Sequence, residues 1–234
     1  MNITYIANMR MPTEKAHGIQ IMKTCESLAK HGATLSLVVP KRHSDISEDV
    51  FTYYGVEPLF AVKKVAVLDT VSFGKIGFLV EAFSFLVSII LRSTLFKKTV
   101  LYSRDEIILA PLALLYKEYV VWESHSGTWN MFSRYLATRA NKIIVISHGL
   151  KQFYLGKGVP EAKLIVAPDG VDLHIFSNPP TKEEARAILE LSDMRTIVMY
   201  IGRVDSWKGV QVLLEAAKHV PSTVDVVIVG GEPG

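Results

Sequence analysis

Short apolar segments alternate with amphipathic helical patterns along almost the whole chain, and this alternation restricts the fold more than any other feature. The beginning of the chain shows it first: an apolar strand is predicted at residues 3–8, a helix with one apolar face at 18–30 and a second strand at 34–39. Units of this kind make right-handed crossovers in a parallel sheet. The sequence therefore predicts an α/β fold built on a doubly wound parallel sheet.

The alternation continues through the middle of the chain and restarts after a break rich in proline. Further strands are predicted at residues 65–68, 99–102, 119–122, 142–146 and 164–167, and further helices at 108–115 and 129–140. The break at 177–180 precedes a short helix at 182–191 with Thr181 as its N-cap, and then a strand–helix–strand pattern at 196–201, 210–218 and 224–229. We expect a Rossmann-like domain over residues 1–176, a linker with a short helix over 177–195, and a second domain over 196–234.

The second domain is too small to bury the sheet that it forms. Two strands and one helix leave most of their apolar surface exposed, and units below about 40 residues rarely stabilise themselves. We therefore expect residues 196–234 to be only the first βαβ unit of a second Rossmann-like domain, and the chain to be a fragment or a truncated product of a longer protein.

Composition gives no support for a nucleic-acid partner and indicates the compartment of the protein. The 26 Lys and Arg residues exceed the 23 Asp and Glu residues by only three, which gives no support for a nucleic-acid partner. The one cysteine, Cys25, cannot form an internal disulfide, which fits a reducing compartment. The chain opens on a strand pattern rather than on a signal-peptide pattern. We expect a cytoplasmic protein.

Residues 76–96 form the most apolar segment of the chain, and two interpretations of it stay open. Its polar residues, Glu81, Ser84, Ser88 and Arg92, fall on one narrow helical stripe, and lysines flank it on both sides. A helix that is apolar over most of its circumference is usually packed inside a domain. The other interpretation is peripheral contact with the inner face of the membrane, where the basic flanks favour anionic lipid. Charges interrupt the segment too often for it to span a bilayer.

Two turns at the carboxyl ends of predicted strands suit anionic ligands. The loop at residues 9–17 is long for such a connection and ends on Gly18, where a helix begins and a backbone can approach a ligand closely. The turn at 202–209 carries Arg203 and Lys208, and two cations at the start of a helix suit a diphosphate. In both places a solvated surface segment is the alternative, and the residues alone leave it open.

Several segments, collinear over essentially the whole chain, resemble family 4 of the retaining glycosyltransferases of the GT-B fold. The resemblance lies in the Gly-Arg-x4-Lys-Gly turn at residues 202–209, in the passage at 166–172 with Phe176, in the strand and following residues at 143–151, and in the loop at 12–20. It implies transfer of a sugar from a nucleoside-diphosphate sugar to a sugar, lipid-linked or small-molecule acceptor, with retained anomeric configuration and with no metal or other cofactor.

The resemblance also implies roles for individual residues. Arg203 and Lys208 would neutralise the leaving diphosphate, Gly18 would present backbone to the same phosphates, and Gly231 would lie at the nucleotide. His125 would lie near the donor sugar as the catalytic histidine, although a hydrogen-bonded turn histidine is the alternative from the residues alone. The acceptor would face four residues of the first loop: Arg10, Glu14, Lys15 and His17.

The chain also departs from the pattern of this family. A glycine pair often ends the first loop, and here the pair is His17-Gly18; Asp169 stands where asparagine is common; and the Glu-x7-Glu motif of the family would lie beyond Gly234. Activity of this chain alone is therefore not implied. Two other functions stay open, a sugar-nucleotide epimerase of the same fold and a non-catalytic binding module. The sequence contains no phosphate-binding Gly-x4-Gly-Lys-Ser/Thr motif, no dinucleotide-binding Gly-x-Gly-x-x-Gly motif and no histidine spacing typical of a metal site.

Overall fold

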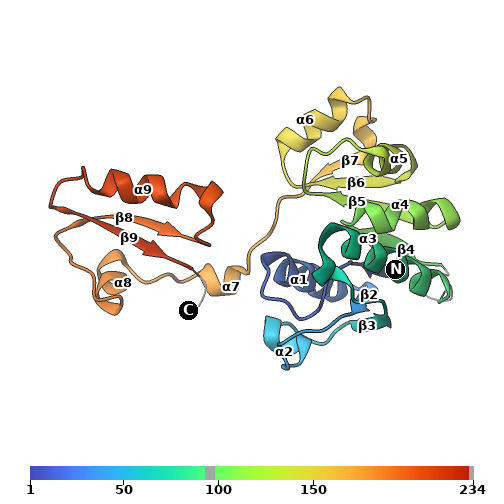
Figure 1. The fold of residues 1–234 in the computed structure, drawn as a ribbon, viewed down its shortest axis with the longest axis horizontal. Helices are drawn as coiled ribbons and strands as arrows, with labels where there is room; N and C mark the ends of the chain where they lie inside the picture. The colour runs from blue at the N-terminus through green and yellow to red at the C-terminus, as the bar shows by residue number, and fades with distance from the viewer. Residues whose placement is uncertain (93–97, 232–234) are drawn as a thin grey trace. The chain divides into compact units, whose positions relative to one another are not determined.

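The computed structural model describes residues 1–92 and 98–231, with the backbone alone at 174–175 (Figure 1). The chain forms two compact units, Met1–Gly170 and Val171–Gly234. The sequence placed this boundary at residue 176, whereas in the structure the short helix α7 (Leu173–Phe176) belongs to the second unit. The turn Pro168-Asp169-Gly170, just after the last strand of the first unit, is where the two units divide.

The first unit is built on a parallel seven-stranded sheet in the order β3-β2-β1-β4-β5-β6-β7. Every neighbouring pair is parallel. The strands are β1 (Asn2–Ile6), β2 (Thr34–Lys41), β3 (Ala61–Ala66), β4 (Val100–Ser103), β5 (Tyr119–Ser124), β6 (Lys142–Val145) and β7 (Leu164–Val166). The order reverses between β1 and β4, so the predicted doubly wound sheet is confirmed. Loops at the carboxyl ends of these strands are the usual place for a ligand in such sheets.

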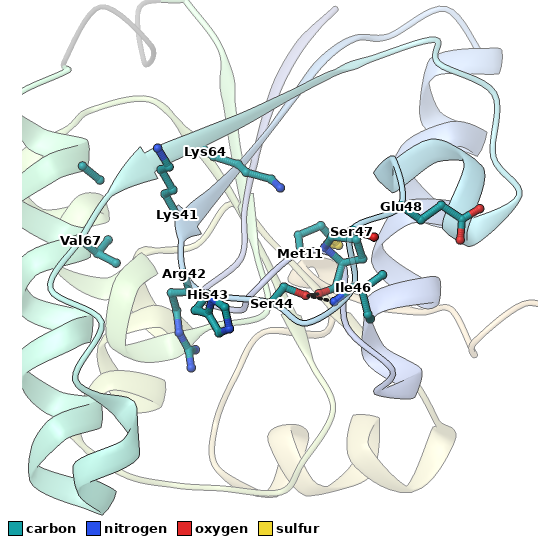
Figure 2. A pocket seen from close by; sticks show the side chains of 12 residues that line it. Met11, Lys41, Arg42, His43, Ser44, Ile46, Ser47, Glu48, Lys64 and Val67 are labelled. Atoms are coloured by element: carbon teal, nitrogen blue, oxygen red, sulfur yellow. Dashed lines mark hydrogen bonds between the residues drawn. The ribbon is translucent and has the colours of Figure 1, made fainter. Parts of the chain in front are cut away.

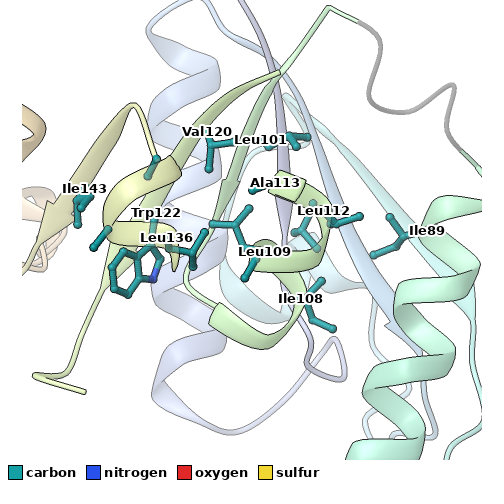
Figure 3. Packing of buried hydrophobic residues seen from close by; sticks show 14 of the residues in the cluster. Ile89, Leu101, Ile108, Leu109, Leu112, Ala113, Val120, Trp122, Leu136 and Ile143 are labelled. Atoms are coloured by element: carbon teal, nitrogen blue, oxygen red, sulfur yellow. The ribbon is translucent and has the colours of Figure 1, made fainter. Parts of the chain in front are cut away.

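Helices cover both faces of this sheet and bury a separate apolar cluster on each. Helices α1 (Ala16–Lys30) and α2 (Val50–Tyr54) pack on one face around Tyr5, Leu37 and Cys25. The other face is covered by α3 (Gly74–Ile90), α4 (Glu106–Leu115), α5 (Met131–Arg139) and α6 (His148–Gly156). Figure 3 shows the second cluster, in which Trp122 and the α4 leucines fill the space between strands and helices. The two buried layers fix the strand ends that carry the polar residues described below.

Sequence patterns missed two helices of this unit. Helix α2 has only five residues; it begins at an Asp49 side chain that accepts hydrogen bonds from the amides of Phe51 and Thr52, and it ends on Gly55 with φ 57°. Helix α6 begins where the Ser147 hydroxyl accepts a hydrogen bond from the amide of Leu150. Local caps of this kind stabilise short helices whose apolar periodicity is too brief to recognise.

Helix α3 differs most from what its sequence suggested. Its polar stripe faces the protein: Glu81 is fully buried and accepts a hydrogen bond from Asn8 Nδ2 at 3.0 Å. Ser84 Oγ accepts from the Leu68 amide, and Ser88 Oγ donates to the Ala66 carbonyl, so both hydroxyls bond to the end of β3 and the segment that follows. The outer face of the helix is apolar and exposed. The prediction that this helix packs wholly inside the domain is therefore wrong, and residues 93–96 of the predicted segment lie outside the described residues.

The second unit contains α8 (Lys182–Ile188), β8 (Thr196–Ile201), α9 (Val210–Ala217) and β9 (Val224–Val229). Strands β8 and β9 pair in parallel, which confirms the predicted βαβ unit. Thr181 caps α8 through a reciprocal pair of hydrogen bonds with Glu184, as the sequence predicted. Val210 is the one buried residue among those of this unit whose burial is described, and β8 and β9 leave apolar side chains exposed, as expected for so small a sheet.

Candidate functional site

The carboxyl ends of β4 and β5 meet around the carboxylate of Glu123. Its Oε1 atom contacts His125 Nε2 at 2.5 Å and accepts a hydrogen bond from Arg104 Nη2 at 2.9 Å. Its Oε2 atom accepts from the Tyr102 hydroxyl at 2.6 Å and, more weakly, from the Tyr5 hydroxyl at 3.4 Å. Both oxygens of this buried carboxylate on β5 are thus satisfied by donors from β1 and β4 and from the residues that directly follow β4 and β5. We call these five residues the Glu123 cluster.

Charge and hydrogen bonding in the Glu123 cluster keep Glu123 ionised. Burial alone would raise its pKa, but the hydrogen bond from His125, the positive charge of Arg104 and the hydrogen bond from Tyr102 outweigh burial and lower the pKa to about 2. Burial and the negative charge of Glu123 raise the pKa of the Tyr5 and Tyr102 hydroxyls, which therefore stay protonated as donors. The cluster is a stable arrangement of one carboxylate, one guanidinium and a histidine ring of fixed orientation.

Polar residues of helix α1 and of the turn after β7 extend this cluster. Gln20, on the second turn of α1, accepts a hydrogen bond from Arg104 Nη1 at 3.4 Å and donates to Asp169 Oδ2 at 3.0 Å. His17, one turn earlier on α1, is half-buried; burial lowers its pKa, and the charges of Lys15 and Arg104 lower it further. The structure therefore brings the start of α1, the ends of β4 and β5 and the turn after β7 to one edge of the sheet.

Two residues of the Glu123 cluster, together with Asp169, have the chemistry of metal ligands. Within the described part of the chain, ligand atoms of Glu123, His125 and Asp169 lie within 4.8 Å of one another. Glu123 Oε1 and Oε2 already accept hydrogen bonds, and His125 Nε2 already contacts Glu123, so a divalent cation would have to displace Arg104 or the histidine. Here Glu123 bonds to His125 and to Arg104, and the expectation that the protein uses no metal stays a prediction.

Tyr54 packs against Gly18 so closely that a side chain at this position has no room. A Cβ atom at Gly18 would lie 2.3 Å from the Tyr54 hydroxyl oxygen and 2.8 Å from Thr13 Cγ2. That hydroxyl accepts from the Thr13 amide at 2.7 Å and donates to the Thr13 carbonyl at 2.8 Å, which holds the first loop against α1 and α2. The Gly18 amide itself donates to the Lys15 carbonyl. The contact between Gly18 and donor phosphates stays a prediction.

Replacing Gly18 by alanine is expected to lower the free energy of unfolding by about 1–3 kcal/mol, because the new methyl group overlaps the Tyr54 hydroxyl. The loss should be smaller when Tyr54 is already replaced by phenylalanine, and a double-mutant cycle in urea measures that coupling. Gly156→Ala is the control, since a Cβ there meets nothing within 4 Å. Equal effects of the two alanine substitutions would contradict the packing role.

The four predicted acceptor residues do not form one group. Arg10 and Glu14 form an ion pair with each other, with the two Glu14 oxygens 2.7 and 2.8 Å from Arg10 Nη2. Lys15 is exposed and precedes α1, and His17 lies on the side of the Glu123 cluster. The pairing holds Arg10 and Glu14 within the loop, and their role toward an acceptor stays a prediction.

A basic pocket of about 510 Å³ lies beside this loop, at the carboxyl ends of β2 and β3 (Figure 2). Met11 and Pro12 of the loop form one wall, and the Ser44 hydroxyl donates to the Pro12 carbonyl at 3.1 Å. Four basic residues and one acidic residue line the pocket: Lys41, Arg42, His43, Lys64 and Glu48. Arg42 is paired with Asp69 and His43 with Asp45, so Lys41 and Lys64 provide the positive charge that suits an anionic group.

In the second unit, Arg203 and Lys208 share one acidic partner. Arg203 Nη2 lies 3.6 Å and Lys208 Nζ 3.4 Å from the carboxylate of Asp205, and Lys208 Nζ lies 5.3 Å from the centre of the Trp207 ring. The turn therefore holds two cations around one carboxylate directly before α9. An anion with two charges can replace Asp205 as the partner of both side chains.

The ends of β8 and β9 come into direct backbone contact at this turn. A Cβ at Gly230 would lie 1.8 Å from the Gly202 carbonyl oxygen, and Gly202 and Gly230 have φ of 151° and 142°. Both positions therefore require glycine. Gly231 follows with φ 119°, beside the turn of Arg203, and its nucleotide contact stays a prediction.

Sequence reasoning missed Arg104, Tyr5, Tyr102 and the pairing role of Gln20. A signal for Arg104 was available, because it follows a predicted strand closely, just as His125 does. Nothing in the local sequence of Tyr5 or Tyr102 distinguishes a buried donor from an ordinary aromatic core residue. These contacts depend on strand register, since Tyr5 of β1 lies beside Tyr102 of β4.

No protein-family model matches the chain. Among curated proteins, it is 32% identical over 104 residues to the lipopolysaccharide 1,2-N-acetylglucosaminetransferase of Salmonella typhimurium, a match that covers 43% of this chain and 27% of that protein. It is 35% identical over 78 residues to the D-inositol 3-phosphate glycosyltransferase of Xylanimonas cellulosilytica, covering 31% of this chain and 18% of that protein. The matched segments are thus a minor part of these relatives.

Solved structures match almost the whole chain and 61–65% of their own length. Sucrose-phosphate synthase from Thermosynechococcus elongatus has a TM-score of 0.76 at 19% identity, covering 99% of this chain and 63% of that one. Anabaena HepE in complex with UDP-glucose has a TM-score of 0.67 at 14% identity (99% and 61%), and the UDP-GlcNAc 2-epimerase from Neisseria meningitidis one of 0.61 at 16% (97% and 65%). The chain therefore has the GT-B fold: the sheet of the first unit and the βαβ unit of the second are those of GT-B proteins.

Proposed function

We propose that this chain belongs to a glycosyltransferase that transfers a sugar from a nucleoside-diphosphate sugar to an acceptor. The observation that carries the proposal is the Glu123 cluster, which holds His125 at the ligand-binding edge of a GT-B sheet. Similarity over parts of the chain to proteins named as glycosyltransferases supports it. Membership of family 4 and retention of anomeric configuration are part of the proposal and rest on the sequence motifs.

His125 is proposed to contact the donor sugar. Glu123 binds Nε2 of its ring, which leaves Nδ1 as the ring nitrogen that can bond to a sugar hydroxyl or to the reacting region. A sugar that leaves its phosphate develops oxocarbenium character, and a fixed polar group beside it stabilises that charge without reorganising.

Arg203 and Lys208 are proposed to bind the diphosphate of the donor. In this structure both side chains pair with Asp205. When a diphosphate binds, its two phosphate groups would replace this single carboxylate as their partner. No metal ion enters this proposal, because two side-chain cations and the start of α9 meet the charge of the leaving group. Gly231 is assigned to the nucleotide and Gly18 to the donor phosphates on the motifs alone.

The acceptor side is proposed to lie along the first loop, with Arg10, Glu14, Lys15 and His17. The basic pocket next to this loop fits an acceptor that carries an anionic group, whether a sugar, a lipid-linked molecule or a small molecule. A cytoplasmic location is proposed as well, since Cys25 is buried and unpaired.

A sugar-nucleotide epimerase is the second candidate, since solved epimerases share the fold of this chain. An epimerase needs groups that take up and release a proton at the sugar ring. Glu123, with a pKa of about 2 and donors on both oxygens, is a poor proton carrier, which favours glycosyl transfer. A non-catalytic binding module is the third candidate, and the experiment below separates all three.

The test incubates the full-length protein with a panel of nucleoside-diphosphate sugars and candidate acceptors and measures nucleoside diphosphate release. We expect release that depends on an acceptor, and a loss of about 10²–10⁴-fold in kcat for His125→Ala with unchanged tryptophan fluorescence. Epimerised sugar nucleotide without transfer would show the second candidate to be right, and sugar-nucleotide binding without any turnover would favour the binding module.

A further inference from the structure

Helix α3 presents an unbroken apolar stripe on its outer face. The residues recur at intervals of three and four and therefore lie on one side of the helix and its preceding turn. They are Phe73, Ile76, Leu79, Val80, Phe83, Val87 and Leu91, and all are exposed. Phe73 and Ile76 keep 78% and 77% of their surface in contact with solvent, and Phe83 keeps 67%. Contiguous apolar surface of this kind on a folded domain marks an interaction site.

The inner face of the same helix is bound to the domain. Ala82, Phe85 and Ile89 pack into the buried cluster, and Ser84 and Ser88 bond to the Leu68 amide and the Ala66 carbonyl. Rotating the helix to hide its apolar stripe would break these bonds and expose the core residues. The segment Val71–Ile90 is long and apolar enough to cross a membrane by length and composition alone, and 28% of its most apolar 18-residue stretch is buried inside the domain. Its bonds to β3 and the segment after it favour a position on a membrane surface over one across the bilayer.

Exposed basic residues flank the stripe, and Asp69, the acidic residue just before its start, is paired with Arg42. The one carboxylate between residues 71 and 92 is Glu81, which is fully buried on the inner face. Lys75 and Arg92 lie near the two ends of the helix and are exposed. Lys63 is exposed on β3, on the same face of the sheet as Val65, which packs in the α3 cluster. An apolar stripe with basic flanks is complementary to anionic lipid, whose headgroups attract cations while the interface accepts apolar side chains.

We propose that the outer face of α3 docks on an anionic lipid bilayer, with the helix lying in the plane of the interface. A second copy of this chain fits less well, because a symmetric dimer would set the same basic flanks against each other. This proposal rests on α3 alone and does not depend on the glycosyltransferase proposal. If both hold, docking brings the first unit to the surface at which a lipid-linked acceptor resides.

The test is flotation of the chain with phosphatidylcholine vesicles that contain about 30% phosphatidylglycerol, compared with vesicles of phosphatidylcholine alone. The proposal predicts binding to the anionic vesicles that weakens as salt increases. Ile76→Asp with Phe83→Asp should lower the partition constant at least about tenfold, since two inserted apolar side chains are replaced by charges. Lys63→Glu with Lys75→Glu should lower it severalfold and reduce its dependence on salt. Met131→Asp is the matched control, because Met131 is 74% exposed on α5, and its binding should equal that of the unchanged protein.

Light scattering coupled to size exclusion and sugar-nucleotide binding are measured on the same variants. Absence of binding to anionic vesicles at low salt would overturn the proposal, as would equal binding by the Ile76→Asp/Phe83→Asp variant. A dimer that this variant dissociates, without vesicle binding, would instead assign the face to a second copy. Because donor binding is a separate readout, its loss or retention reports on the proposed function and leaves the membrane result unaffected.

Discussion

Glu123→Gln is expected to lower the free energy of unfolding of the first unit by about 3 kcal/mol at pH 7. The substitution removes the negative charge that pairs with Arg104 and that accepts hydrogen bonds from two tyrosine hydroxyls. The Arg104 side chain is only 13% exposed. A buried cation without its partner is strongly destabilising. Converted to free energy, the shift of the Glu123 pKa from 4.5 to about 2 corresponds to a loss of similar size.

The expected loss depends on pH in a defined direction. The pKa of Glu123 is lower in the folded than in the unfolded protein, so its contribution to stability is complete above about pH 5 and is lost as the pH falls through 2. The unchanged protein and the Glu123→Gln variant should therefore converge in stability as the pH approaches 2.

Urea unfolding followed by tryptophan fluorescence measures this difference. Trp207→Phe in both proteins removes the exposed tryptophan of the second unit and leaves Trp122 and Trp129, which pack in the first unit, as reporters. Glu48→Gln is the control, since Glu48 is exposed. A difference below about 1 kcal/mol, or one that persists unchanged at low pH, would refute the role assigned to the Glu123 cluster.

If the protein is the proposed glycosyltransferase, Arg203→Ala in the full-length protein is expected to lower kcat by about 10²–10³-fold and to change KM much less. Negative charge on the leaving diphosphate grows in the transition state, so a guanidinium at this turn stabilises the transition state more than the bound donor. Lys208→Ala should act in the same direction. Steady-state kinetics with saturating acceptor separates the two parameters.

Two controls accompany these variants. Lys218→Ala removes a cation of the same unit that pairs with Glu215 near the end of α9, and its kcat should not change. Asp205→Asn removes the carboxylate that holds both cations, and it should leave donor binding equal or tighter. An unchanged kcat in Arg203→Ala would reject the donor-diphosphate role of this turn.

Most strands of both units could be predicted because they carry clear local signals. Strands β8 and β9 of the second unit begin and end where the sequence placed them, and β1 and β2 agree within two residues. Buried parallel strands are nearly continuous apolar runs, so their identity does not depend on distant contacts. The predicted β3 begins four residues and ends two residues too late, because edge residues Lys63 and Lys64 interrupt its apolar pattern.

The orientation of α3 could not be read from its sequence. Composition showed a polar stripe and a wide apolar face, and the usual rule places the apolar face inside. Here the end of β3 and the segment after it offer a backbone amide and a carbonyl to Ser84 and Ser88, and Asn8 offers its side chain to Glu81. These tertiary hydrogen bonds decide which face points inward.

The candidate site was predictable only in part. His125 and the turn of Arg203 and Lys208 follow strands directly, so their positions at a carboxyl edge could be predicted. The partners that define their chemistry, Glu123 with Arg104 in one unit and Asp205 in the other, depend on side-chain geometry. For Gly18, the sequence indicated an open backbone, whereas Tyr54 occupies that space.

Product analysis after one reaction with an isotopically labelled nucleoside-diphosphate sugar tests the central claim most directly. The full-length protein is mixed with donor and acceptor, and the anomeric centre of the product is assigned by nuclear magnetic resonance. The account predicts a glycosylated acceptor with the anomeric configuration of the donor, formed in proportion to the nucleoside diphosphate released. An acceptor that stays unmodified across the donor panel, while the protein is folded and binds sugar nucleotide, would contradict it.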